Sequence, residues 1–168
     1  MTHNPLAASP AFKGKSQNGL YGDATEELDW SMGVLLETLK EEGLDQNTLI
    51  IFTSDNGADE HFGGTNRPLR GEKGTTYEGG FRVPCIMRWP AKIPAGQGTD
   101  NLVTSMDFLP PLAHYCGYAV PSDRVIDGHN VSGILEGESM ASPTETFYYY
   151  QKQQLQAVRW AVSYTHLR

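Results

Sequence analysis

The longest pattern of apolar residues, over residues 23–42, predicts an amphipathic helix. Apolar residues recur there at intervals of four, four, three and four: Ala24, Leu28, Met32, Leu35 and Leu39. This spacing places them on one face of a helix. Asp23 stands where an N-cap is expected, and Gly43 suits the position just after a helix end.

A short apolar run, Asn47–Thr53, follows this helix and predicts a strand buried on both faces, as in a parallel sheet. Further strands are expected at residues 81–89, where Pro84 favours an edge or bulge, and at Thr146–Tyr150. A second helix is expected at residues 105–115. So few elements cannot complete a doubly wound sheet of about five or six strands. The chain is therefore expected to be a piece of a larger α/β domain.

Composition narrows the possible functions. The 168 residues carry a formal net charge of −7 and no basic stripe, which argues against general nucleic-acid binding. No apolar run approaches the ~18 residues of a membrane span. The two cysteines, Cys85 and Cys116, form no metal motif, and a disulfide framework is not expected. Glycine (18) and proline (10) exceed the roughly 12% of an average chain, which predicts long, shaped loops.

Two oxygen donors, Asp55 and Asn56, follow the predicted strand directly. Ligands of open α/β sheets bind beyond the carboxyl ends of the strands. A carboxylate and an amide carbonyl are hard ligands suited to Ca²⁺ or Mg²⁺, and Gly57 allows the sharp turn that would aim both at one ion. The alternative is an ordinary Asx turn without a ligand.

A glycine-rich segment, Arg70–Gly80 (RGEKGTTYEGG), completes the long loop that begins at Ser54. Its glycines allow close approach of the backbone to a ligand, and Lys73 adds a compact cation with three donors, which suits a tetrahedral oxyanion. A solvated surface lysine is the alternative. The segment is not a P-loop, because it lacks the spacing of that motif.

Taken together, these segments resemble the sulfatases, and more narrowly the arylsulfatases and the sulfatases of sulfated sugars. The resemblance runs from about residue 3 to about 159 and rests on an ordered set of motifs: Tyr21-Gly22-Asp23, Thr48–Gly57 (TLIIFTSDNG), Leu69–Pro84 (LRGEKGTTYEGGFRVP), Trp89-Pro90, Met106–Pro110 (MDFLP) and Asp127-Gly128.

This resemblance implies a domain organisation. The fold expected is part of an alkaline-phosphatase-like sulfatase domain, α/β with a mixed sheet flanked by helices, truncated at its N-terminal side. Residues 1–144 would form the second half of the catalytic domain and residues 145–160 the start of a small C-terminal sheet, while residues 161–168 depart from the family pattern as a tail of doubtful origin. An extracytoplasmic location (periplasmic, secreted or lysosomal) is also implied.

The resemblance further implies residue roles. Sulfatases hydrolyse sulfate esters with calcium and a formylglycine made from cysteine or serine; here a sulfated small molecule or glycan would be the substrate. Asp55 and Asn56 would ligate Ca²⁺, with Mg²⁺ an alternative. Lys73 would bind the sulfate and stabilise the leaving side. His3, in Thr2-His3-Asn4-Pro5, would contact the sulfate and protonate the leaving alcohol, a step suited to imidazole near neutral pH.

One departure limits these expectations. The nucleophile motif C/S-x-P-S-R is absent, so the nucleophile and the other calcium ligands would lie outside this chain, which alone should be inactive. Two alternatives remain open. One is a phosphate or phosphonate ester hydrolase of the same superfamily, with a threonine or serine nucleophile and two transition metals. The other is a non-catalytic member that binds calcium or sugar.

Several other polar residues are interpreted without a catalytic role. His61 lies in the long loop and is expected to be solvated. Asp107, near the start of the second predicted helix, is expected to cap it, and His129, after Asp127-Gly128, is expected to be structural.

Overall fold

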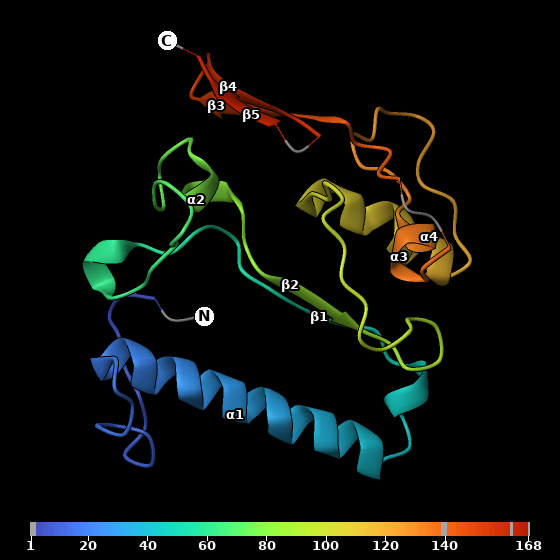
Figure 1. Ribbon diagram of the computed structural model, residues 1–168. Helices are drawn as coiled ribbons and strands as arrows, with labels where there is room; N and C mark the ends of the chain where they lie inside the picture. Colours follow the sequence, from blue (N-terminus) through green and yellow to red (C-terminus); the bar gives the residue numbers. More distant parts are fainter. Residues whose placement is uncertain (1–2, 139–140, 162, 168) are drawn as a thin grey trace. The chain divides into compact units, whose positions relative to one another are not determined.

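The computed structural model describes residues 3–138, 141–161 and 163–167 (Figure 1). The chain divides into two compact units, Met1–Ile86 and Met87–Arg168. The first contains α1 (Gly19–Glu41), the 3₁₀ turns η1 (Asp45–Asn47) and η2 (Glu60–Phe62), β1 (Ile50–Thr53) and α2 (Glu78–Phe81); β2 (Cys85–Arg88) spans the boundary. The second contains η3 (Ser105–Phe108), α3 (Leu109–Tyr115), α4 (Ser132–Leu135) and the strands β3 (Thr146–Gln151), β4 (Gln154–Trp160) and β5 (Ser163–His166).

Helix α1 confirms the longest periodic pattern, but Asp23 is not its cap. The helix begins four residues earlier, and the buried Asp23 carboxylate accepts backbone N–H bonds from Gly14 (2.7 Å), Lys15 (3.1 Å) and Ser16 (2.8 Å). Asp23 therefore fastens the preceding loop to the helix. These bonds, led by the one from Gly14, lower the pKa of the Asp23 carboxyl because they stabilise its charged form. At the other end Gly43 adopts the expected left-handed conformation, with φ of 69°.

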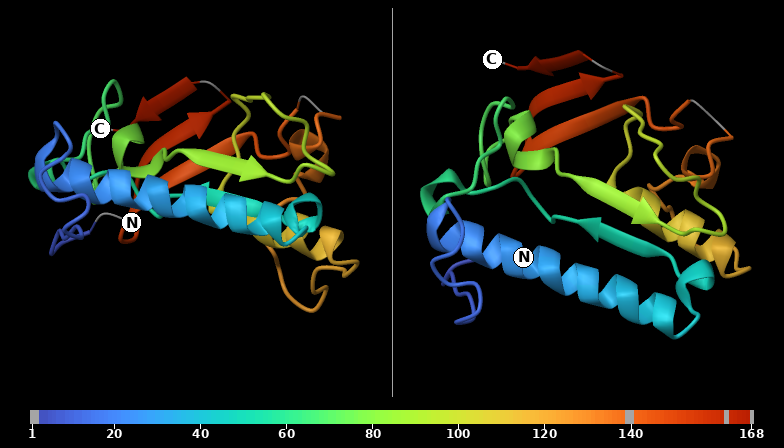
Figure 2. Two further views of the ribbon diagram at one scale, coloured as in Figure 1. Left: turned by 90° about the horizontal axis from the view of Figure 1, so that it is seen from below. Right: turned by 60° about the horizontal axis from the view of Figure 1, so that its bottom comes forward.

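The apolar face expected for α1 is only partly covered. Asp23 is the one residue of the helix that is buried, and Leu35 from the predicted face is 46% exposed. Trp30 and Val34 are 57% and 46% exposed. Within its unit the helix runs alongside β1 (Figure 2).

Strand β1 is half-buried throughout and hydrogen-bonds with β2. The two strands run in opposite directions (Figure 2), so the parallel arrangement expected from the apolar run is wrong for this pair. Strand β2 is also shorter than the predicted span of 81–89, because residues 78–81 form α2 and Pro84 lacks the N–H that a ladder needs. The Thr53 hydroxyl donates to the Pro84 carbonyl at 3.0 Å, at the end of β1.

The second unit confirms Asp107 as a cap and adds a second role for it. Thr104 and Asp107 form a capping box at the start of η3, which leads directly into α3. Asp107 is 1% exposed, and its other oxygen accepts the N–H of His129 at 2.8 Å. The ring of His129 lies 3.2 Å from the Thr144 hydroxyl, in agreement with its structural interpretation. One buried carboxylate thus joins the helix start to a distant loop.

The C-terminal strands form an antiparallel sheet in the order β3-β4-β5. The predicted strand at Thr146–Tyr150 is confirmed as β3. Residues 163–166, within the segment expected to be a tail, form β5, with Val158 opposite Thr165. The connection between α3 and β3 contains α4, whose Ile134 is buried. No helix in the described ranges is long and apolar enough to cross a membrane.

Candidate functional site

The loop Ser54–Gly80, called the site loop below, closes on itself at its two ends. The Gly57 N–H donates to the Gly80 carbonyl at 3.0 Å, and the Gly79 N–H donates to the Arg70 carbonyl at 2.8 Å. A Cβ on Gly57 would collide with the Gly79 carbonyl, and one on Gly79 with the Gly71 carbonyl. Glycine is therefore required where these backbone segments touch.

Asn66 braces the middle of the site loop. Its side-chain oxygen accepts the Ala58 N–H at 2.7 Å, and its amide nitrogen donates to the carbonyls of Ala58 (2.8 Å) and Gly71 (3.2 Å). The Lys73 N–H also donates to the Ala58 carbonyl, at 3.1 Å. Ala58 lies three residues after Asp55, so these bonds hold the backbone of Lys73 close to the turn that carries the expected metal ligands. No periodic pattern in the sequence predicts these hydrogen bonds of Asn66.

A tight turn presents Lys73. Gly71 and Gly74 on either side of it have φ of 86° and 85°, a conformation that L residues with side chains rarely adopt. The Thr75 hydroxyl donates to the Glu72 carbonyl at 2.7 Å and accepts the Glu72 N–H at 3.1 Å. Lys73 itself is exposed at the tip of this turn.

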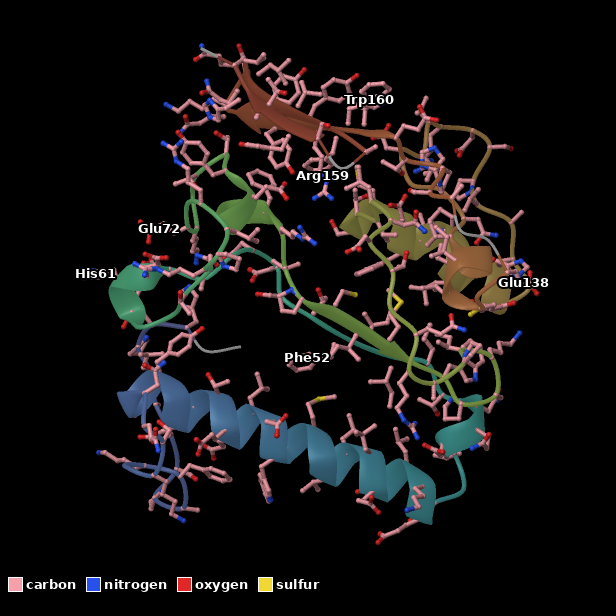
Figure 3. The ribbon with its side chains drawn as sticks, in the orientation of Figure 1. Phe52, His61, Glu72, Glu138, Arg159 and Trp160 are labelled. Atoms are coloured by element: carbon pink, nitrogen blue, oxygen red, sulfur yellow. The ribbon has the colours of Figure 1, made fainter. Side chains whose placement is uncertain are left out.

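The neighbouring turn η2 is tied to the same segment. The Glu72 carboxylate accepts the Glu60 N–H at 3.0 Å, and both Glu72 and His61 lie in this part of the site loop (Figure 3). His61 is exposed, as expected, and its ring packs edge-on against Phe62 at 5.1 Å between centroids.

His3 and Lys73, seventy residues apart in sequence, lie side by side. The distance from Lys73 Nζ to His3 Nε2 is 3.2 Å, and His3 Nδ1 lies 2.9 Å from the Asn4 carbonyl oxygen. Because a carbonyl only accepts, Nδ1 is assigned the ring proton, and Nε2 of the neutral ring then accepts from the ammonium group. Both side chains are exposed. Two nitrogen-bearing side chains from distant parts of the sequence are therefore brought together at one point.

Asp55 and Asn56 have side chains that are available for a ligand. Asp55 is exposed and Asn56 half-buried, and the Asn56 backbone carbonyl accepts the Ser54 hydroxyl at 2.9 Å. Among the described residues, neither side chain has a hydrogen-bond or ion-pair partner. Nor do the described residues contain a group of three or more His, Cys, Asp or Glu that could hold a metal ion. This chain therefore offers two hard oxygen ligands and not a complete metal site.

Comparison with known proteins identifies the family. The sequence model of the Sulfatase family matches residues 1–118. Human steryl-sulfatase is 46% identical over 166 residues, which cover 94% of this chain and 28% of that protein. N-acetylgalactosamine-6-sulfatase of Canis lupus familiaris is 42% identical over 161 residues, with 94% of this chain and 30% of that protein covered. The chain thus spans less than one third of either relative.

Solved structures agree with the sequence relatives. The PsFucS1 sulfatase from Pseudoalteromonas sp. matches with a TM-score of 0.87 and 34% identity, over 98% of this chain and 34% of that one. BT4656, solved in complex with its substrate D-glucosamine-2-N,6-O-disulfate, matches with a TM-score of 0.64 and 27% identity, over 89% of this chain and 33% of that one. The fold is α/β and of the alkaline-phosphatase-like type, as expected. The chain belongs to the sulfatase family.

Proposed function

We propose that this chain forms part of an enzyme that hydrolyses sulfate monoesters, with a sugar sulfate preferred over an aryl one. The observation that carries the proposal is the 3.2 Å distance from Lys73 Nζ to His3 Nε2, in a turn whose backbone is hydrogen-bonded to Ala58, three residues after Asp55. The sulfatase names of the relatives support sulfate over phosphate or phosphonate chemistry. A structural neighbour solved with a disulfated amino sugar supports the sugar. An extracytoplasmic location remains a prediction of the family resemblance.

Lys73 and His3 would have different roles in the same reaction: Lys73 would stabilise negative charge, and His3 would supply a proton. Cleavage of a sulfate ester builds negative charge on the bridging oxygen. The Lys73 ammonium would offset negative charge on the sulfate, and because it is already in place, no reorganisation of water is needed. The ring proton on His3 Nδ1 is held by the Asn4 carbonyl. Because the neutral ring carries its proton on Nδ1, delivery of a proton to the leaving alcohol would require His3 to gain a second proton on Nε2, the atom that faces Lys73.

Asp55 and Asn56 would hold a calcium ion, with Mg²⁺ as the alternative. Their oxygens are of the hard type that these ions prefer, and both side chains are free of protein partners among the described residues. A bound divalent ion would supply positive charge to the sulfate oxygens. The formylglycine nucleophile and the remaining metal ligands are assigned to polypeptide outside this chain. Residues 1–168 alone should consequently not hydrolyse 4-nitrophenyl sulfate.

Calorimetric titration of the chain with sulfate and with calcium tests the proposal. Lys73→Ala should weaken sulfate binding about tenfold or more, because a charged hydrogen-bond donor is lost. Asp55→Ala should weaken calcium binding, because it removes a charged ligand. The matched controls are Lys13→Ala and Asp29→Ala, which remove exposed groups of the same charge outside the site loop. Unchanged sulfate affinity in Lys73→Ala would refute the anion site, and unchanged calcium affinity in Asp55→Ala would refute the metal assignment.

A further inference from the structure

The sequence contains one Asn-x-Ser/Thr tripeptide, Asn130-Val131-Ser132, at the start of α4. None of the other six asparagines has serine or threonine two positions later, and the middle residue of the tripeptide is not proline, which would exclude it. Such a tripeptide is the acceptor sequence for N-linked glycosylation in proteins of the secretory pathway. Because a motif of three residues also occurs by chance, its place in the fold must be considered.

Asn130 lies on the surface, between two residues whose backbones are held. The Asn130 side chain is exposed, whereas Val131 is only 2% exposed. Val131 is also the N-cap of α4, and its carbonyl accepts the Ile134 N–H at 3.0 Å. On the other side of Asn130, the His129 N–H donates to the buried Asp107 carboxylate at 2.8 Å. The burial of Val131 thus leaves the preceding side chain on the solvent side of the turn.

The carboxamide of Asn130 is oriented by the backbone of its own turn. Its Oδ1 accepts the Ser132 N–H at 3.1 Å, as in turns where an asparagine side chain bonds to the residue two positions later. Oδ1 is the atom in this contact because a backbone N–H requires an acceptor. Among the described residues, the amide nitrogen Nδ2 has no hydrogen-bond partner. A sugar attached to Nδ2 would therefore replace no contact within the part of the chain that the structure describes.

We propose that Asn130 carries an N-linked glycan, transferred from an oligosaccharide on a lipid pyrophosphate. In this step a bond forms between Asn130 Nδ2 and the anomeric carbon of the first sugar. The bond from that carbon to the pyrophosphate oxygen breaks, the lipid pyrophosphate leaves, and Nδ2 loses one proton. The inference uses the extracytoplasmic location that is predicted above. It does not depend on the sulfate chemistry of the first unit.

Expression of the chain in mammalian cells, behind a cleavable secretion signal, tests the proposal. The mass of the protein recovered from cells and medium is measured before and after treatment with peptide N-glycosidase, which releases the glycan and converts its asparagine to aspartate. The unchanged chain should lose the mass of one glycan, and peptide mapping should locate the conversion at position 130. Asn130→Gln and Ser132→Ala should carry no glycan, whereas Ser132→Thr, which keeps the hydroxyl group, should carry one. The matched control is Asn47→Gln, which removes an exposed asparagine outside the tripeptide and should be glycosylated like the unchanged chain.

Two results would overturn the proposal: an unchanged chain whose mass does not respond to the enzyme, and a glycan that persists in Ser132→Ala. If Asn130→Gln does not fold, the peptide map of the unchanged chain decides, because it locates the modified residue without a substitution. The Tm of the glycosylated chain and of the enzyme-treated chain should differ by less than about 2 °C, as for surface changes that remove no contact. A much lower Tm of the glycosylated chain would contradict the exposed position of Nδ2. Sulfate titration of Lys73→Ala tests the proposed function separately, so either proposal can fail without the other.

Discussion

The site loop and the C-terminal sheet hold their shapes by different means. In the sheet, regular backbone pairing places Tyr149 opposite Ala157, both buried, and the ring of Tyr149 packs edge-on against Tyr164 at 5.2 Å between centroids. The site loop has no such ladder. Its shape comes from single side chains such as Asn66 and from glycines at points of backbone contact, such as Gly79.

This difference separates residues that stabilise from residues that can bind. In the sheet Tyr149 and Ala157 are buried and contribute stability through burial, while Tyr148, Tyr150 and Trp160 are exposed. In the site loop the backbone is held by glycines and by single polar side chains such as Asn66 and Glu72, and the side chains of Asp55 and Lys73 are exposed. Substitutions in the sheet should therefore lower the stability of the second unit without changing sulfate affinity. Substitutions of the residues that hold the site loop should lower both stability and sulfate affinity.

The largest effect on stability is expected for Tyr149→Ala. Removing this 3% exposed aromatic side chain should destabilise the second unit by about 3–5 kcal/mol, the usual cost of truncating a buried ring. Urea denaturation followed by hydrogen exchange in β3–β5 would measure it. Sulfate affinity of the first unit should remain unchanged, and a parallel loss of sulfate binding would show that the two regions are not independent.

Gly79→Ala should disrupt the closure of the site loop. The added Cβ collides with backbone carbonyls of Gly71 and Arg70, which cannot move away as a flexible side chain would, so a cost of about 1–3 kcal/mol is expected. Amide exchange at Gly57 and Gly79 should accelerate, and sulfate binding should weaken. Gly98→Ala is the matched control, because a Cβ there meets no atom within 4 Å and no positive φ is involved; an equal effect in both variants would contradict the packing argument.

Asn66→Asp tests the hydrogen bonds of the Asn66 side chain with almost no change in the size of that side chain. The carboxylate can still accept the Ala58 N–H, but it cannot donate to the carbonyls of Ala58 and Gly71. Leaving these partly buried carbonyls unpaired should cost about 1–3 kcal/mol and loosen the Lys73 turn. Hydrogen exchange at the Lys73 N–H reports this directly. Asn47→Asp, on the exposed η1, should leave that exchange rate unaltered.

The smallest effect should be a pH dependence from Asp23. Three backbone N–H donors lower its pKa in the folded state below the unfolded value of about 3.9, so its stabilising contribution is complete above that value. The contribution is lost as the pH falls through the lower, folded pKa. Tm should therefore differ between the unchanged protein and Asp23→Asn at pH 6, and the difference should shrink towards pH 3. A difference independent of pH would argue against these hydrogen bonds.

Periodic patterns predicted the longest helix and one strand of the C-terminal sheet. The spacing of apolar residues located α1, and the aromatic run located β3, because burial of one face repeats along a helix or strand. The acidic residue near the start of the second helix was correctly interpreted as its cap. Family motifs on consecutive residues also carried the family assignment.

Contacts between distant residues could not be predicted in the same way. The antiparallel pairing of β1 with β2 depends on the path of the chain between them. The apolar residues of either strand do not indicate the direction of the other strand. The roles of Asp23 and Asn66 depend on backbone groups several residues away, which follow no period. Residues 163–166 pair with β4 through backbone hydrogen bonds. Such pairing does not require the segment to match the sequence pattern of the family.

The most direct test of the central claim is nuclear magnetic resonance of the five histidine rings during a sulfate titration. Before sulfate is added, the His3 ring should carry its proton on Nδ1, as its contact with Asn4 requires. Addition of sulfate should shift the His3 ring signals more than those of the other histidines, and Lys73→Ala should abolish that shift. If the His3 signals stay unchanged, or respond equally in Lys73→Ala, then His3 and Lys73 do not share one anion site.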